Sequence, residues 1–122
     1  MANLINYKQI LLPMRYIILI VALAVFMTAC TSSGKFDTFA QCISEKNITM
    51  YGTEWCPHCK TQKQLFGDSF QYINYVDCDR YQEECLAAGV DGYPTWTSQG
   101  LRYSGTQPLP RLAQISGCQL PQ

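Results

Sequence analysis

Hydrophobic and polar residues follow one another in a pattern that predicts short helices and strands from about residue 36 onward. Apolar side chains recur at helical spacing in residues 36–47, and the β-rich segment ITMYG follows at 48–52. We expect a second helix over residues 57–66, closed by Gly67, and then a strand over residues 71–78, which are rich in Tyr, Ile and Val. The first half of this region therefore runs helix, strand, helix, strand.

The second half adds a helix, a hairpin and a last helix. Residues 80–89 predict a short helix, the turn Gln99-Gly100 joins strands at 93–98 and 101–105, and residues 108–117 predict the last helix. The right-handed crossover rule makes the first two strands parallel neighbours. The sequence thus predicts an α/β domain with a central mixed four-stranded sheet flanked by helices, in the order α-β-α-β-α-β-β-α.

Residues 1–29 have a different pattern, which is typical of an export signal. Arg15 is followed by the uncharged run YIILIVALAVFMTA at 16–29 and then by Cys30. The 14 residues of this run fall short of the roughly 20 that a membrane-spanning helix needs. We expect a signal peptide, with an uncleaved anchor as the alternative, and a start at Met14 would give a more compact signal. Either version places the rest of the chain outside the cytoplasm.

The segment FMTAC resembles a bacterial lipobox, in which the cysteine is diacylated and becomes the mature N-terminus. This resemblance implies a lipidated Cys30 that anchors the protein to a membrane, with an ordinary cleaved signal as the alternative. The residues after Cys30 are small and polar. We therefore expect residues 30–35 to be a flexible tether and residues 36–122 to be the folded domain.

Composition and charge narrow the classes of function. At 122 residues, with 48% hydrophobic and 15% charged residues, the chain is expected to hold one globular domain. Lys8 and Arg15 are the charged residues before Cys30, so the rest of the chain has seven basic and nine acidic residues and a net charge of −2. It has no basic cluster to neutralise phosphates, which argues against nucleic-acid binding.

The most specific motif is EWCPHC, in which two residues separate Cys56 from Cys59. The predicted order places Cys56 where the first strand ends and the next helix begins. Free N–H groups and the positive end of the helix dipole stabilise a thiolate at that point. Cys59 lies one helical turn later and can resolve a mixed disulfide formed by Cys56. The spacing therefore predicts a redox-active disulfide, with no other cofactor.

The residues beside and between the cysteines are expected to tune them. Pro57 and His58 lie between the two thiols, and whatever stabilises the reduced thiolate makes the disulfide more oxidising. His58 can add positive charge or a hydrogen bond to the Cys56 thiolate, and the alternative is a solvent-facing helix residue with no special role. Trp55 has two interpretations as well, as a tuning residue or as a packing residue.

A zinc site is an alternative for the same cysteines. It would need two more ligands from among His58, Cys78 and Cys85, whereas a zinc ribbon normally has a second close pair. Cys78 and Cys85 are seven residues apart with a predicted helix between them. We therefore expect no metal site.

Six cysteines follow Cys30, an even number in a compartment that permits disulfides. Cys78 ends the second strand and Cys85 lies in the helix after it, so we predict a structural disulfide between them, with a secondary redox role left open. Cys42 and Cys118 remain, and their pairing follows only from parity.

Five segments, FAQC, MYGTEWCPHCKTQKQLFGDSF, INYVDCD, EECLAAGVDGYPTW and YSGTQPLPRLAQISG, together resemble one known family. They are similar to the thioredoxin-like domain that is fused to bacterial and plant homologues of vitamin K epoxide reductase. The resemblance covers residues 36–118 and implies a thioredoxin-like fold with catalytic Cys56 and Cys59. The motif Cys-Pro-His-Cys also resembles that of periplasmic oxidants of the DsbA type.

The same resemblance implies a substrate-binding loop at Tyr93 and Pro94. A cis bond between them would let the Tyr93 backbone pair with an extended substrate and would place Pro94 beside the disulfide. An ordinary trans proline at the start of a strand is the alternative. In a thioredoxin-like layout the helices that carry Cys42 and Cys118 can lie on opposite faces of the sheet, so their bridge stays open.

The resemblance also implies electron exchange with a quinone-linked membrane partner that keeps the cysteine pair oxidised. We expect the export signal and Cys30 to take the place of the family's multi-helix membrane domain here, so that a lipid holds the domain near a separately encoded, vitamin K epoxide reductase-like partner. Met50 stands six residues before Cys56, where reducing thioredoxins have a buried acid. Its presence weakens the reductase interpretation.

These observations favour an exported, membrane-tethered thiol-disulfide oxidoreductase that oxidises protein thiols in the periplasm or at the cell exterior. A disulfide reductase or isomerase that runs in the opposite direction is the first alternative. A non-catalytic binding module whose cysteines are all structural is the alternative from another class.

Overall fold

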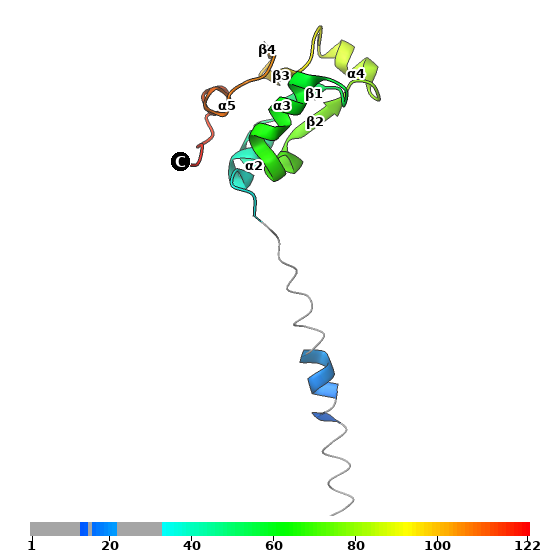
Figure 1. The fold of residues 1–122 in the computed structure, drawn as a ribbon, viewed down its shortest axis with the longest axis vertical. Coiled ribbons are helices and arrows are strands. Elements are labelled where there is room, and N and C mark those ends of the chain that lie inside the picture. The colour runs from blue at the N-terminus through cyan, green and yellow to red at the C-terminus, as the bar shows by residue number, and fades with distance from the viewer. Residues whose placement is uncertain (1–12, 15, 22–32) are drawn as a thin grey trace, which may run out of the picture. The chain divides into compact units, whose positions relative to one another are not determined.

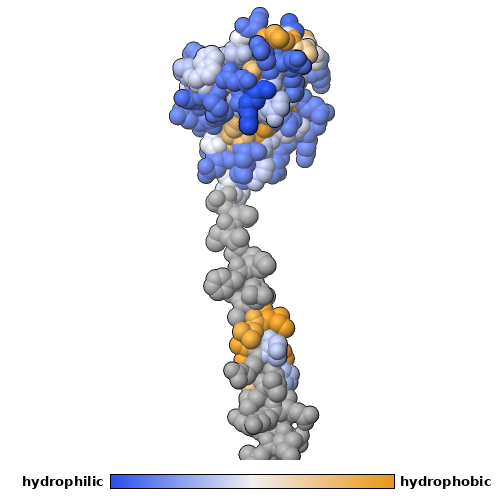
Figure 2. Space-filling view, turned by 90° about the vertical axis from the view of Figure 1, so that its right-hand side faces the viewer, coloured by the Kyte–Doolittle hydropathy of each residue, from blue (hydrophilic) through white to orange (hydrophobic). Residues whose placement is uncertain are grey.

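The computed structural model describes residues 13–14, 16–21 and 33–122, which belong to two units that divide after Ser32. In the first unit residues 13–14 and 16–21 are helical, and their side chains are exposed and mostly hydrophobic (Figure 2). Most of the predicted signal, Cys30 and the start of the tether lie outside the described residues. Within the described ranges, no helix has the length and apolar character needed to cross a bilayer.

The second unit has the predicted order of helices and strands, with one added 3₁₀ helix, η1 (Figure 1). The elements are α2 (Asp37–Glu45), β1 (Thr49–Gly52), α3 (Pro57–Phe66), η1 (Gly67–Tyr72), β2 (Asn74–Asp77), α4 (Gln82–Ala87), β3 (Thr95–Ser98), β4 (Leu101–Ser104) and α5 (Leu109–Ser116).

The four strands form one mixed sheet in the order β2-β1-β3-β4. β1 pairs in parallel with β2, where Met50 faces Tyr75, and antiparallel with β3, where Met50 faces Trp96. β3 and β4 form an antiparallel hairpin, and both Gln99 and Gly100 in its turn have positive φ, which suits a two-residue hairpin turn. The predicted mixed sheet is confirmed, and its strand arrangement is that of a thioredoxin-like fold.

Three helices cover one face of this sheet and one helix covers the other. Neighbouring side chains of a strand point to opposite faces, so Met50 joins the large core while Tyr51 joins a small second cluster. The large core gathers apolar side chains of α2, α3 and α5 around Trp96, which is fully buried. The second cluster connects Tyr51 to α4. The outer surface in view carries mostly hydrophilic residues with a few separate hydrophobic areas (Figure 2).

The second strand is shorter than predicted. The expected strand over residues 71–78 begins only at Asn74, because η1 continues to Tyr72. Phe70 on η1 packs edge to face against Phe66 and Tyr75, with ring centroids 6.2 Å and 5.7 Å apart. This packing places an aromatic side chain in the core from a helical turn, and it outweighs the strand propensity of the local sequence.

A buried glutamine joins α3 to the hairpin and to the segment before α5. Gln62 is fully buried, and its Oε1 accepts hydrogen bonds from Trp96 Nε1 at 3.1 Å and from the backbone N–H of Gln107 at 2.6 Å. Its Nε2 donates to the Gln107 carbonyl at 3.0 Å. Gln62 is not among the residues that the sequence motifs single out, although a polar residue on the buried side of α3 is a signal. The network fixes the position of the helix that begins with the cysteine motif.

Candidate active site

Cys56 lies at the junction between β1 and α3 and is the N-cap residue of α3. Its backbone is extended, with φ −71° and ψ 119°, and Pro57 occupies the first turn of the helix. Proline costs nothing there because the first N–H groups of a helix have no partner within it. The Cys56 Sγ accepts a hydrogen bond from the Cys59 N–H at 3.2 Å. The structure therefore places the two cysteines where the sequence predicts them, one helical turn apart.

Both cysteines of the motif are free thiols, but they differ in exposure. Cys56 is 4% exposed and Cys59 is fully buried. Burial raises the pKa of the Cys59 thiol to about 12; a hydrogen bond with Cys56 adds to the rise, while the Thr53 backbone and the charge of Lys63 oppose it. A thiol with such a pKa is protonated at neutral pH, so Cys59 reacts as a nucleophile only when its surroundings stabilise the thiolate.

Cys59 can approach the sheet closely because β1 ends in a glycine. A Cβ atom on Gly52 would lie 2.8 Å from the Cys59 Sγ and 3.4 Å from Cε2 of Tyr75. The first distance is too short for a side-chain carbon, so any other residue would displace Cys59. Gly52 is a site residue that the sequence motifs do not reveal.

The residues predicted to tune the cysteines are on the surface. Trp55 is 63% exposed and is therefore not a core packing residue. His58 is also exposed, and its backbone carbonyl accepts a hydrogen bond from Thr106 Oγ1 at 3.2 Å. This contact ties the first turn of α3 to the segment before α5 through the main chain and leaves the imidazole facing solvent.

The predicted substrate loop lies beside the cysteine motif. The Tyr93-Pro94 bond is cis, Pro94 is buried and Tyr93 is 37% exposed. The Tyr93 ring meets the Trp55 ring edge to face, with centroids 6.1 Å apart. The loop with the cis bond therefore contacts the residue before Cys56 through a pair of exposed aromatic side chains.

The other four cysteines of the second unit form two disulfides. Cys42 bonds to Cys118 with a Cα–Cα distance of 6.0 Å, and Cys78 bonds to Cys85 with a Cα–Cα distance of 5.8 Å. The helices near Cys42 and Cys118 lie on the same face of the sheet, so the arrangement on opposite faces considered from the resemblance is wrong.

The zinc alternative loses its ligands in this arrangement. It needs Cys78 or Cys85, and these two bond to each other. Across residues 33–122 and the short helical stretch before them, no three His, Cys, Asp or Glu side chains form a group that could hold a metal ion.

A charged cluster around Lys63 lies next to Cys59, and the sequence motifs did not reveal it. Lys63 lies one turn after Cys59 on α3, and its Nζ is 2.6 Å from Glu54 Oε1, 4.2 Å from the ring centroid of Tyr75 and 5.5 Å from that of Phe70. The hydrogen bond from Lys63 lowers the pKa of the Glu54 carboxyl. Burial, followed by the charge of Glu54, raises the pKa of the Tyr75 hydroxyl. The four-residue spacing between Cys59 and Lys63 is the signal that could have revealed the cluster.

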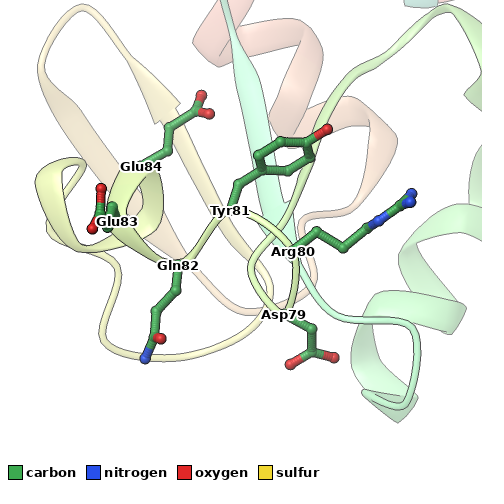
Figure 3. Close-up of a pocket in the computed structure, with 6 residues that line it drawn as sticks. All are labelled: Asp79, Arg80, Tyr81, Gln82, Glu83 and Glu84. Atoms are coloured by element: carbon green, nitrogen blue, oxygen red, sulfur yellow. The ribbon is translucent and has the colours of Figure 1, made fainter.

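A surface recess of about 470 Å³ lies away from the cysteine motif, over the connection between β2 and α4. It is lined by Asp79, Arg80, Tyr81, Gln82, Glu83 and Glu84. Figure 3 shows that the polar ends of these side chains point in different directions and do not converge on one point. The recess offers no constellation for catalysis or for binding a compact ligand.

The fold and the paired thiols define a class: thioredoxin-like domains with a Cys-x-x-Cys motif at the start of a helix. The chain is similar to the thiol-disulfide oxidoreductase LTO1 of Arabidopsis thaliana, with 33% identity over 113 residues that cover 84% of this chain and 30% of that protein. The chain thus spans less than a third of the length of this relative. No protein-family model matches the chain.

Among solved structures, the chain is similar to oxidized glutaredoxin 2 from Chlamydomonas reinhardtii. The TM-score is 0.38 at 18% sequence identity, over 70% of this chain and 98% of the glutaredoxin chain.

Proposed function

We propose that this chain is an exported, membrane-tethered thiol-disulfide oxidoreductase that oxidises protein thiols with a Cys56–Cys59 disulfide. The observation that carries the proposal is the pair of free thiols at the start of α3, with Cys56 at the helix N-terminus and Cys59 buried one turn behind it. The name of the Arabidopsis thaliana relative, a thiol-disulfide oxidoreductase, supports the same chemistry.

In the proposed reaction, a substrate thiolate attacks the Cys56 Sγ of the disulfide. A bond forms between these two sulfurs, the Cys56–Cys59 bond breaks, and its electron pair leaves on Cys59, which then takes up a proton. A second thiolate of the substrate attacks the first substrate sulfur, so the substrate gains a disulfide and Cys56 leaves as a thiolate. The substrate loses two electrons and the cysteine pair gains them.

Attack at Cys56 rather than at Cys59 follows from access. Cys56 retains some exposed surface and Cys59 has none. Cys56 also follows Trp55, which contacts Tyr93, so a peptide that lies along Tyr93 and Pro94 would carry its thiol to Cys56. Substrates would be unfolded or newly exported chains, because their thiols and extended backbones are accessible.

Turnover needs an oxidant for the reduced pair, and we assign this role to a quinone-linked membrane protein of the vitamin K epoxide reductase type. The motifs of residues 36–118 support this partner, and a lipid on Cys30 would keep the domain at the same membrane. Deleting such a partner should leave Cys56 and Cys59 reduced in cells, as read by thiol alkylation and mass. An unchanged oxidation state would exclude the partner.

The direction of electron flow is tested by measuring the reduction potential of Cys56 and Cys59 at equilibrium with glutathione. A potential near the roughly −120 mV of DsbA would identify a disulfide donor, and one near the roughly −270 mV of thioredoxin would identify a reductant and reverse the assignment.

The binding-module alternative is tested by a Cys59→Ser variant, which should accumulate Cys56-linked mixed disulfides with exported proteins. A Cys56→Ser/Cys59→Ser variant is the matched control, and no trapped species would favour the binding module.

Anchoring is tested separately from chemistry. Mass spectrometry of the N-terminal peptide should show a diacylated Cys30, and a Cys30→Ser variant should move from the membrane fraction to the soluble fraction. An unmodified Cys30 in the membrane fraction would favour an uncleaved anchor.

A further inference from the structure

Lys63 occupies a position from which its charge acts directly on Cys59. The two residues are four apart on α3, so their side chains leave the helix on the same face. That face packs against the sheet, and Cys59 is fully buried there. The side chain of Lys63 is itself only 24% exposed, so a residue type that usually extends into solvent is held close to the buried thiol.

Three side chains hold the Lys63 ammonium in place. Glu54 binds it at 2.6 Å, and the rings of Tyr75 and Phe70 present their faces to it at 4.2 Å and 5.5 Å from their centroids. Aromatic faces attract cations, and a carboxylate completes the charge balance. The ammonium is therefore confined on several sides, unlike that of Lys60, which is exposed on the same helix.

Tyr75 connects this group of side chains to the thiol. The position that a Cβ would take on Gly52 is 2.8 Å from the Cys59 Sγ and 3.4 Å from Cε2 of Tyr75, so the sulfur and the ring flank the same point. The Tyr75 hydroxyl is buried, and within residues 33–122 it makes no hydrogen bond of normal geometry, although it interacts with the Glu54 carboxyl and helps to lower its pKa. A buried hydroxyl without a well-formed hydrogen bond is uncommon and marks this side of the thiol as a polar place in an otherwise apolar core.

We propose that Lys63, held by Glu54, Tyr75 and Phe70, is the electrostatic partner of Cys59 and sets the rate at which Cys59 forms and releases its thiolate. The inference rests on the proposed function for its role in turnover, since Cys59 receives the electron pair when the disulfide is opened. A negative charge on a buried sulfur needs a nearby positive charge, and Lys63 supplies it without entering the covalent step.

Cys56 and Lys63 are the titratable groups that act on Cys59. Glu54 and Asp77 act on Tyr75, the neighbouring ring on β2, whose hydroxyl also feels the charges of Cys59 and Cys56. Lys63 is the cation among them that acts on Cys59, and Glu54 offsets part of its charge. Removing Lys63 and removing Glu54 should therefore change the reactivity of Cys59 in opposite directions.

The test measures Cys59 alone, in the full chain carrying Cys30→Ser and Cys56→Ser, so that Cys59 is the remaining free thiol. The rate of alkylation by iodoacetamide is followed from pH 7 to pH 10. Lys63→Met should lower the rate at pH 8.5 about tenfold, which corresponds to a pH profile displaced upward by about one unit. Lys63→Arg should stay within about twofold of the parent, and Lys60→Met, the matched loss of charge on the exposed side of α3, should do the same.

Glu54→Gln should change the alkylation rate of Cys59 in the opposite direction. Glu54 is exposed, so this substitution should leave the fold intact. It should raise the rate about threefold in the parent and have no effect when combined with Lys63→Met, because its action passes through Lys63. Equal rates for Lys63→Met and Lys60→Met, or a rate that Glu54→Gln leaves unchanged or lowers, would overturn the proposal. If Lys63→Met does not fold, as judged by its two disulfides and circular dichroism, the Glu54→Gln result decides.

This measurement needs no substrate and no partner, so it separates the inference from the proposed function. Effects of Lys63 on Cys59 without trapped mixed disulfides would refute the oxidoreductase activity alone. Trapped mixed disulfides without an effect of Lys63 would refute the inference alone.

Discussion

Two neighbouring strand-loop-helix units of this protein each contain a cysteine pair, and only one pair remains as free thiols. In the β1–α3 unit Cys56 caps the helix and Cys59 follows three residues later. In the β2–α4 unit Cys78 directly follows the strand and bonds to Cys85 within α4. The strands are parallel neighbours and the Cys78 N–H donates to the Gly52 carbonyl at 2.8 Å, so both units share one edge of the sheet.

The difference shows that position relative to the helix start decides what a cysteine pair does. A cysteine at the N-cap with its partner one turn on has free helix N–H groups beside it and a buried thiol behind it. A cysteine at the strand end with its partner seven residues on spans the whole connection and fastens it. The surroundings differ as well, because Cys59 has a charged cluster beside it whereas Cys85 lies in a small apolar cluster.

The largest expected effect is on activity, and it should separate the Cys56–Cys59 pair from the Cys78–Cys85 pair. Cys56→Ser should reduce oxidation of a reduced model protein to the uncatalysed rate, because no sulfur remains to carry the mixed disulfide. A Cys78→Ser/Cys85→Ser variant should keep activity within a few-fold of the parent. Both are followed by loss of substrate thiols under an oxidising glutathione buffer. Comparable losses in the two variants would mean that Cys78 and Cys85 take part in the exchange.

Removing the two structural disulfides should lower the free energy of unfolding by different amounts. Cys42 and Cys118 are 76 residues apart, and Cys78 and Cys85 are 7 apart. Chain entropy predicts a loss of about 4–5 kcal/mol for serine replacement of the first pair and about 2–3 kcal/mol for the second. Urea unfolding at neutral pH measures both. Equal losses would mean that native contacts, not loop length, set the contributions.

A further expected effect is on the stability that the buried side-chain amide of Gln62 provides. This amide joins α3 to the hairpin, and α4 has no comparable contact among the described residues. Gln62→Leu should lower the free energy of unfolding by about 2–3 kcal/mol, because the fully buried Trp96 N–H and the Gln107 amide lose their acceptor. Gln64→Leu, at an exposed position of the same helix, is the control and should change it by less than about 0.5 kcal/mol. Equal stability of the two variants would assign the network no energetic role.

The smallest expected effect is a loss of stability at alkaline pH, which below about pH 10 comes mainly from Cys59. Below about pH 9 Cys59 is protonated in the folded and unfolded chain, so stability is complete; above it the unfolded chain loses the proton first, and stability falls until the folded pKa of about 12 is passed. The reduced protein should lose about 1 kcal/mol of unfolding free energy between pH 9 and 10. A Cys59→Ser variant should lose clearly less over that interval, because the Tyr75 hydroxyl, whose pKa is also raised by folding, has only begun to ionise in the unfolded chain. A decline as steep in this variant would assign the effect to another group.

Much of the architecture was predictable from local sequence because propensity, periodicity and turn chemistry agree. Pro57 favours the first turn of a helix, and Gly100 allows the positive φ that the hairpin turn needs. Together with the periodicity of the apolar residues, such positions predict the order of helices and strands. The strand at 71–78 was predicted too long because the packing of Phe70 against Phe66 is a tertiary contact that no local pattern records. The Cys42–Cys118 bridge needed the placement of α2 and α5 on one face, which is also a property of the whole fold.

By itself the sequence determined the class of fold and the position of Cys56 and Cys59 at the start of a helix. Both depend on spacing along the chain, which local geometry converts directly into distance, whereas the candidate loop at Tyr93 and Pro94 came from the resemblance to a known family. Only the tertiary structure decided that Cys59 is fully buried against Gly52 and that Lys63 stands beside it, held by Glu54 and two aromatic rings. Burial and charge at a thiol are set by residues from separate elements, and their meeting depends on how the whole chain packs.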